Sequence, residues 1–211
     1  MMLHSSVPPY FQLGKLSEAL KPLISVDKHN QLEMILKGYE ERFESFKLEL
    51  YRVKLGLVGK VELDAELVEL LLQIMETIKA DYTQTFRDLA ELSLDDLKNM
   101  RIPESAWGLH QCLGNKRLKT FLETYVERIE KSGVTDEERM TKMQKVNPRY
   151  ILRNWIAQKA IEMAEHDDFT EVEFLLELLR NPFRTNVLAE EKGFASRPPK
   201  WSASLAVSCS S

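Results

Sequence analysis

The sequence predicts an all-helical protein. Only eight of its 211 residues are glycine, and no sustained stretch alternates apolar and polar residues as a half-buried strand would. Several segments instead repeat apolar residues every three or four positions, which places those side chains on one helix face. Hydrophobic residues make up 44% and charged residues 29% of the chain, a balance typical of a globular domain with a substantial core.

Three segments in the first half carry helical spacing. Residues 27–55 repeat Met34, Ile35, Tyr39, Phe43, Phe46, Leu50 and Val53 along one face. Leu67, Leu70, Leu71, Ile74 and Ile78 define a second helix, with Asp64 as its expected cap, and residues 81–92 define a third. Gly56 and Gly59 lack the spacing of a phosphate-binding loop, so they predict a turn. Ser93 with Asp96 is close to a capping box.

The second half has clearer helix boundaries. Residues 115–129 predict a helix that stops by Gly133, and residues 135–138 form a capping box for the next. Asn147-Pro148 predicts the start of a helix that runs to about Met163, because asparagine caps helices and proline suits their first position. Residues 170–173 predict a third capping box for a helix ended by Pro182, and residues 184–199 a loop.

The chain shows no internal repeat and no obvious linker. We therefore expect one helical domain over residues 11–211, preceded by a disordered leader over residues 1–10 that lacks the features of a secretory signal. The net charge of −4 and the pI near 5.7 argue against nucleic-acid binding, which normally uses a basic surface. No apolar run reaches the roughly 18 residues that suggest a membrane span. These features predict a cytoplasmic protein with neither nucleic acid nor membrane as a partner.

The two cysteines, Cys112 and Cys209, are too few for a disulfide framework and fit a reducing compartment. Cys209 lies two residues from the end of the sequence, after a double proline, Trp201, Leu205 and Val207. An exposed thiol in such a position is a candidate for exchange or oxidation chemistry. The alternative is an apolar C-terminal anchor with an unreactive cysteine, and a Cys112–Cys209 bridge also stays open.

Other candidate sites have simpler structural explanations. His166-Asp167-Asp168 has no second group of ligands at metal-binding spacing, so a solvated helix end explains it better. Asp168-Phe169-Thr170 differs at its third position from the metal-binding Asp-Phe-Gly of kinases, and Thr170 is expected to cap a helix. His110 and Cys112 are two residues apart, a spacing that separates side chains on a helix.

Three arginines form the last candidate group. Arg149 and Arg153 are four residues apart, so on a helix they would share a face and could hold a carboxylate or phosphate together. Ion pairs of Arg149, Arg153 and Arg180 with the many glutamates are the favoured interpretation.

Four segments carry a resemblance to a known family. Arg197-Pro198-Pro199-x-Trp201 followed by Val207-Ser208-Cys209-Ser210-Ser211 resembles the C-terminus of the selenoprotein O family. Residues 147–162 are similar to its Asn-Pro-x-x-x-Leu-Arg-Asn-x-x-Ala-Gln segment, and residues 179–183 follow it in order. Residues 81–87 resemble a further signature, and the similarity extends over about residues 13–211.

The resemblance implies an enzyme with a protein-kinase-like fold that transfers AMP from ATP to hydroxyl side chains of proteins. Family members are much longer, and their ATP and magnesium ligands precede the matched region. The chain would then correspond to the helices of the C-terminal lobe plus a C-terminal extension, without catalytic, cofactor-binding or metal-binding residues of its own. The family's terminal cysteine, which matches Cys209, can pair with a cysteine nearer the active site. Cys209 would thus be a redox element.

Three hypotheses follow. The first is the C-terminal helical region of such an adenylyltransferase, inactive alone, whose partners are the missing catalytic half and the enzyme's protein substrates. The second is a free-standing helical protein-interaction module. The third is an independent enzyme with an unrecognised site, which ranks last because no nucleophile–base pair, metal cluster or phosphate cradle stands out.

Overall fold

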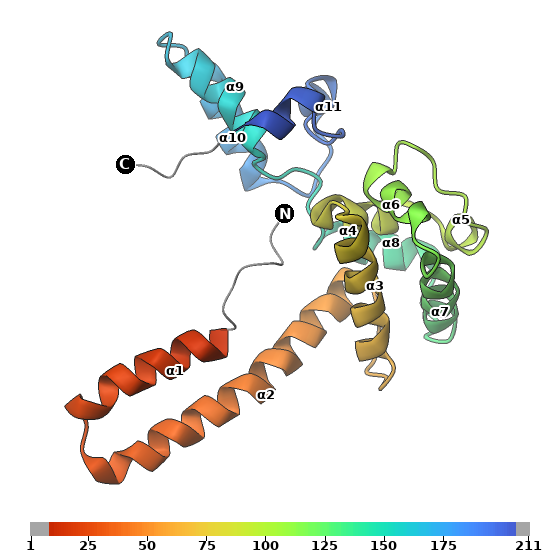
Figure 1. Ribbon diagram of the computed structural model, residues 1–211. Coiled ribbons are helices and arrows are strands. Elements are labelled where there is room, and N and C mark those ends of the chain that lie inside the picture. The colour runs from red at the N-terminus through yellow and green to blue at the C-terminus, as the bar shows by residue number, and fades with distance from the viewer. Residues whose placement is uncertain (1–8, 206–211) are drawn as a thin grey trace.

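The structure is a computed structural model that describes residues 9–205. Within that range it contains eleven α-helices, four short 3-10 helices and no strand, which confirms the all-helical prediction (Figure 1). The helices are α1 (Pro9–Leu20), α2 (His29–Lys54), α3 (Asp64–Ile78), α4 (Tyr82–Glu91), α5 (Leu94–Lys98), α6 (Trp107–Gln111), α7 (Leu118–Glu130), α8 (Asp136–Gln144), α9 (Asn154–Ala164), α10 (Thr170–Arg180) and α11 (Val187–Glu191). Val207, Cys209 and residues 1–8 of the expected leader lie outside the described residues.

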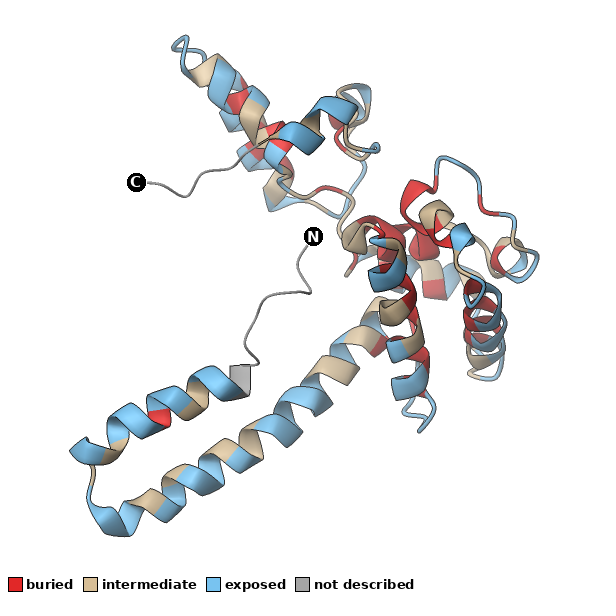
Figure 2. Ribbon diagram, viewed as in Figure 1, coloured by how far each residue is buried: buried red, intermediate tan, exposed pale blue. Residues whose placement is uncertain are grey.

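The helices form three parts. α1 and α2 make a long hairpin that projects from the rest of the molecule, α3 to α8 form a helical body, and α9 to α11 form a second, smaller group (Figure 1). Buried side chains are concentrated in α3–α8, whereas most of α2 is exposed or half-buried (Figure 2). The first core, within residues 55–143, includes Leu71, Ile74, Phe86, Leu89, Leu109, Phe121 and Tyr125. The second core consists of Tyr150, Trp155, Ile156, Ala160, Leu175, Leu178, Ala189 and Phe194.

Glycines at two places in the chain, the α2–α3 connection and α6, shape the first core. Gly56 adopts a φ of 67° and Gly59 a φ of 74° in the connection between α2 and α3, which confirms the predicted turn. Gly108 instead allows close packing of α6 on α4. A Cβ atom at Gly108 would lie 2.6 Å from the backbone nitrogen of Thr85, so a larger residue would separate the two helices.

Two of the expected helix caps are confirmed. The Ser93 hydroxyl accepts a hydrogen bond from the Asp96 amide at 3.1 Å and begins α5. At the start of α8, Thr135 and Glu138 form a reciprocal capping box, because each side chain accepts from the other residue's backbone amide. Asp81, which was not predicted as a cap, accepts from the Gln84 amide at 2.8 Å and begins α4.

Other expected boundaries are wrong. α9 begins at Asn154 instead of Pro148, because the Asn147 side chain donates to the Lys54 carbonyl at 2.7 Å instead of capping a helix. Thr170 forms no capping box: its hydroxyl donates to the Asp168 carboxylate at 2.6 Å. Asp64 lies in the first turn of α3 instead of before it.

The interval expected to be a loop, residues 184–199, contains the short helix α11. A local hydrogen bond caps the start of α11: the Asn186 side chain accepts from the Ala189 amide at 3.0 Å. None of the helices in residues 9–205 combines the length and the apolar character that crossing a bilayer requires.

Candidate functional site

The three internal segments that carry the family resemblance meet at one place, the joint between the two cores. Arg87 of α4 is the buried side chain at its centre. Its Nη1 donates to the carbonyl oxygens of Asn147 at 3.0 Å and Phe183 at 3.4 Å. The amides of Arg149 and Tyr150 both donate to the Pro182 carbonyl, at 2.8 and 3.1 Å. Segments separated by about 60 and 100 residues are thus bonded into one unit, which we call the motif joint.

Arg149 connects the two cores through charge. Its Nε and Nη2 donate to the two carboxylate oxygens of Glu190 on α11 at 2.6 and 2.8 Å, and its Nη1 donates to Glu91 on α4 at 2.7 Å. Bidentate pairing of this kind fixes orientation as well as position. The pKa of Arg149 is raised by its hydrogen bonds to Glu190, and the same bonds lower the pKa of Glu190. The Tyr150 hydroxyl adds a further hydrogen bond to Glu190.

Arg153 makes a second connection. Its Nη1 and Nη2 lie 2.5 and 3.1 Å from the carboxylate oxygens of Asp81, the cap of α4. Its guanidinium also lies 5.4 Å from the centre of the Trp107 ring. Burial alone would raise the pKa of Asp81, but the hydrogen bonds from Arg153 outweigh it and lower that pKa. The Trp107 indole in turn donates to the Ala195 carbonyl at 3.0 Å.

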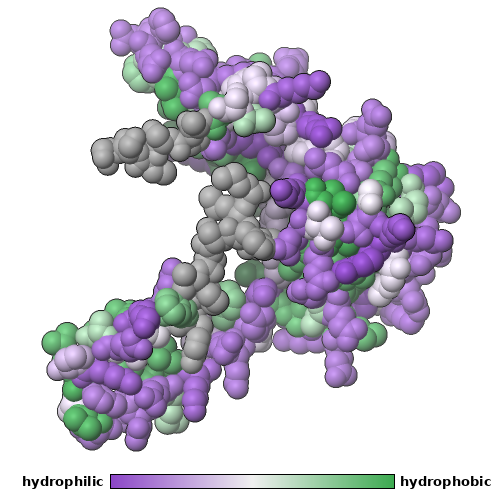
Figure 3. Space-filling model, in the orientation of Figure 1, coloured by the Kyte–Doolittle hydropathy of each residue, from purple (hydrophilic) through white to green (hydrophobic). Residues whose placement is uncertain are grey.

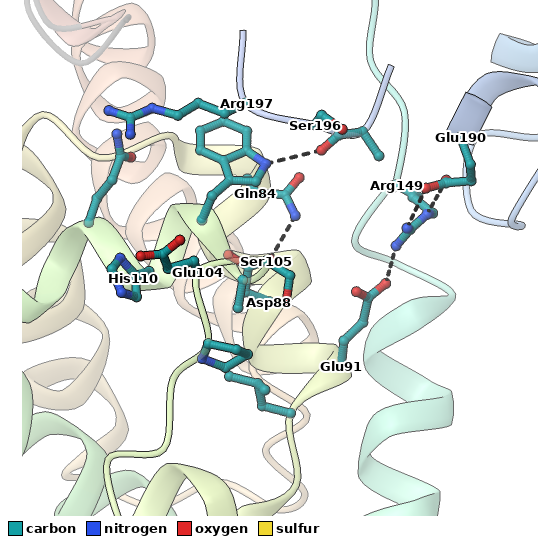
Figure 4. A pocket seen from close by; sticks show the side chains of 16 residues that line it. Gln84, Asp88, Glu91, Glu104, Ser105, His110, Arg149, Glu190, Ser196 and Arg197 are labelled. Carbon is teal, nitrogen blue, oxygen red and sulfur yellow. Dashed lines mark hydrogen bonds and ion pairs between the residues drawn. The ribbon is translucent and has the colours of Figure 1, made fainter. Parts of the chain in front are cut away.

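A hollow of about 790 Å³ lies between α4, α6 and the segment after α11 (Figure 4). Gln84, Asp88, Glu91, Glu104, His110, Arg149, Glu190 and Arg197 are among its lining residues. Asp88 is buried at its base, where the carboxylate accepts from the Gln84 side chain at 2.7 Å and from the Leu109 amide at 2.9 Å. Burial raises the pKa of Asp88 to about 6, against the hydrogen bonds that lower it. Asp88 therefore holds the start of α6 on α4.

Four of the charged groups that line the hollow are held by other protein groups. Glu91 and Glu190 both pair with Arg149, and Asp88 is held by nitrogen donors. Within residues 9–205, no three His, Cys, Asp or Glu side chains are grouped so that they could hold a metal ion. The arrangement can therefore hold two helical groups in a fixed orientation.

The arginines expected to share a helix face do not do so. Arg149 and Arg153 lie in the non-helical segment before α9 and face different acidic partners, Glu91 and Glu190 for the first and Asp81 for the second. Arg180 pairs with Glu177 on the surface at 3.2 Å. The expected ion-pair role is confirmed for Arg149 and Arg180, whereas the partner of Arg153 is an aspartate.

The remaining predicted site residues are dispersed. Cys112 is fully buried, its thiol lies 3.7 Å from the Gly108 carbonyl, and burial raises its pKa to about 11. His166 lies in the turn after α9, where its ring contacts the Glu162 carbonyl at 2.8 Å. Cys209, the residue proposed as a redox element, lies outside the described residues.

Sequence reasoning missed the partners that complete the joint. The sequence did not single out Glu91 or Glu190, and Asp81 was expected only as the start of a helix and as part of a motif. A signal was available for Asp81 and Arg153, because these residues of opposite charge lie in two motifs far apart in sequence; Glu91 and Glu190 lie outside the motifs. The exposure of the apolar face of α2 was missed as well, since periodicity shows a face but not what covers it.

Taken together, the fold and the joint define a class: an all-helical region whose two cores are held together by the buried Arg87 and the half-buried Arg149 and Arg153. A sequence profile described as "Protein adenylyltransferase SelO" matches residues 9–180. The chain therefore belongs to the SelO family. It is similar to "Protein nucleotidyltransferase YdiU" of Pseudomonas fluorescens (strain Pf0-1), with 38% identity over 213 residues, and to the proteins of the same name from Aliivibrio salmonicida (34% over 201) and Pseudomonas aeruginosa (strain LESB58; 37% over 205).

The alignments cover the chain and its relatives unequally. They include 95–96% of this chain but only 39% of each of these three relatives. The chain thus spans about two fifths of the length of the curated relatives it matches.

Proposed function

We propose that this chain is the C-terminal helical region of a protein adenylyltransferase, an enzyme that transfers AMP from ATP to Ser, Thr or Tyr hydroxyls of other proteins. In this proposal ATP and magnesium are bound by the part of the enzyme that precedes the matched region. The helices described above correspond to the C-terminal lobe of a kinase-like fold and brace that active site. The chain alone does not transfer AMP.

The proposal rests on the difference between how much of this chain and how much of its relatives the alignments include. Nearly all of this chain aligns with relatives named nucleotidyltransferases, but it accounts for only 39% of their length. Phosphate transfer requires donors around the phosphates and carboxylates that hold magnesium. Among the described residues, no three His, Cys, Asp or Glu side chains are grouped so that they could hold a metal ion. In the motif joint, Arg149 pairs with Glu91 and Glu190. Both observations favour a region that supports an active site over one that contains it.

Titration of this chain with ATP and magnesium, followed by calorimetry, tests the proposal directly. We expect no binding at micromolar affinity. Saturable ATP binding that requires magnesium would contradict the proposal and favour the hypothesis of an independent enzyme.

Cys209 is proposed as a regulatory thiol of the complete enzyme. Oxidation would join its sulfur to that of a cysteine in the preceding part. Two thiols give up two electrons and two protons to a peroxide such as hydrogen peroxide, which becomes two water molecules. Cys112 is a poor alternative partner, because it is buried in the first core and its pKa is raised to about 11.

Mass spectrometry of the oxidised and reduced full-length enzyme tests this role. A disulfide peptide that contains Cys209, lost on reduction, is the expected result. An enzyme in which Cys209 stays a free thiol after peroxide treatment would contradict it.

The alternative is a free-standing helical interaction module. Such a module would be expected to be a monodisperse monomer with a polar surface. The exposed apolar side chains of the α1–α2 hairpin depart from that expectation, and they favour a region that normally packs against something more.

A further inference from the structure

One face of α2 carries a largely exposed apolar stripe, in which Tyr39 is half-buried and Ile35, Phe43, Phe46, Leu50 and Val53 are exposed. Consecutive members are separated by 4, 4, 3, 4 and 3 residues, so all six lie along one side of the helix. Ile35 is 69%, Phe46 70% and Leu50 66% exposed. Hydrophobic side chains are visible between polar ones on the surface of the projecting hairpin (Figure 3).

The hairpin has little of its own to hold it together. Among residues 11–54 the structure buries Ser17 and Arg52 and no apolar side chain. Eleven of the 24 large hydrophobic residues that are exposed in the described chain lie between Phe11 and Val53. Helices in proteins owe most of their stability to packing of an apolar face. A helix of 26 residues with that face open is therefore incomplete without a further contact.

Within the described residues, α2 is anchored to the first core at its C-terminal end, whereas its N-terminal half contacts α1 and the turn between the two helices. At the C-terminal end, Arg52 pairs with the buried Asp64 at 2.7 Å, and Leu48 and Tyr51 pack partly against the first core. From this end the helix extends about 39 Å at 1.5 Å per residue, so most of the stripe lies away from the first core.

The spacing of the stripe indicates what fits on it. Alternation of three and four residues is the pattern by which one helix packs along another. α2 carries five acidic and five basic residues, so it has no net charge with His29 neutral. Such a surface offers no basic attraction for nucleic acid or anionic lipid. A partner with an apolar helical face is the complementary surface.

We infer that the stripe is the docking surface for the portion of the family enzyme that precedes the matched region, and that this portion places an apolar helix along α2. The inference rests on the proposed function. Two facts select this occupant over a second copy of the chain. More than half of each relative lies outside the alignment, and the part of this chain that matches the family starts at Pro9, the first residue of α1. In a longer protein the preceding portion would lead directly into the hairpin, where covalent linkage gives it a high effective concentration.

A chimera tests the inference. The portion of the Pseudomonas fluorescens relative that precedes the aligned region is joined to this full chain, and hydrogen exchange of α2 is compared between the chimera and the chain alone. We expect the amides of residues 35–53 to exchange at least about tenfold more slowly in the chimera, because a packed helix opens less often.

Two matched variants of α2 make the test specific. Phe46→Glu places a charge in the stripe, whereas Lys37→Glu places one on the opposite, polar face. Phe46→Glu should abolish the added protection in the chimera, and Lys37→Glu should preserve it. Because Phe46 is mostly exposed, neither change should alter the circular dichroism of the chain alone.

Several outcomes would overturn the inference. Equal exchange of α2 in the chimera and in the chain alone is one, and protection that survives Phe46→Glu is another. Protection in the chain alone that rises with concentration and disappears in Phe46→Glu would identify a second copy as the occupant instead. Adenylyl transfer by the chimera is measured separately. Transfer without added protection of α2 would support the proposed function and contradict the docking surface.

Discussion

Replacement of Asp64 by asparagine should be among the most damaging single changes to this chain. The Asp64 carboxylate has no exposed surface and accepts from Arg52 Nε at 2.7 Å and Arg128 Nε at 2.8 Å. It also accepts from the Val61 amide at 3.1 Å. One carboxylate thus joins α2, α3 and α7, and its removal leaves two arginine charges in a poorly hydrated place.

The magnitude follows from the loss of one member of a buried ion pair, which costs about 3–5 kcal/mol. Asparagine keeps the shape and one acceptor, so we expect about 3 kcal/mol. Domains of ordinary stability have about 5–15 kcal/mol in total. For a chain of about 200 residues, 3 kcal/mol corresponds to a fall in Tm of roughly 6–12 °C.

Thermal unfolding followed by circular dichroism at pH 7 measures the change. Asp95→Asn is the matched control, because Asp95 pairs with Arg101 on the surface, where the two side chains are 73% and 53% exposed. Exposed pairs contribute about 0–1 kcal/mol, so the control should melt within about 3 °C of the parent.

The effect should also depend on pH. Burial alone would raise the pKa of Asp64, but hydrogen bonds from Arg128 and Arg52 outweigh it and hold the pKa below its ordinary value. A lowered pKa contributes stability that is present above the ordinary value and is lost as the pH falls through the folded-state value. The difference between parent and Asp64→Asn should therefore be constant from about pH 5 to 8 and shrink below about pH 4. A difference in Tm no larger than the control's, or one that grows in acid, would refute the reasoning.

Three further results are expected. Gly108→Ala should destabilise the chain by about 1–3 kcal/mol in urea unfolding, because its Cβ would lie 2.6 Å from the Thr85 nitrogen; an unchanged midpoint would show that α6 can shift freely. Cys112 should resist alkylation at pH 8 in the folded chain and react in guanidinium, since it is buried and its pKa is raised to about 11; rapid native labelling would contradict this. The Asp88 carboxyl should titrate near pH 6 by NMR, and the free energy of unfolding should fall as the pH rises from about 4 to 6, because the folded state holds this proton longer; a midpoint near 4 would argue against its burial.

Local sequence rules predicted most of the helices but not all of their boundaries. The helices around residues 29–54, 64–78, 82–91 and 118–130 follow from apolar spacing, and the caps at Ser93 and Thr135 from short-range hydrogen bonding. Asn147-Pro148 failed as a helix start because Asn147 bonds to Lys54, 93 residues away. Tertiary hydrogen bonds of this kind compete with local capping and leave no local pattern to detect.

By itself, the sequence determined the all-helical class, the family and the apolar face of α2, because spacing and motifs are written along the chain. Only the tertiary structure decided where these features meet. It brought Arg149 between Glu91 and Glu190, Arg153 to Asp81, and left Phe46 and its neighbours in α2 uncovered. The physical reason is that ion pairing and burial depend on distances between segments far apart in sequence, which no periodicity specifies.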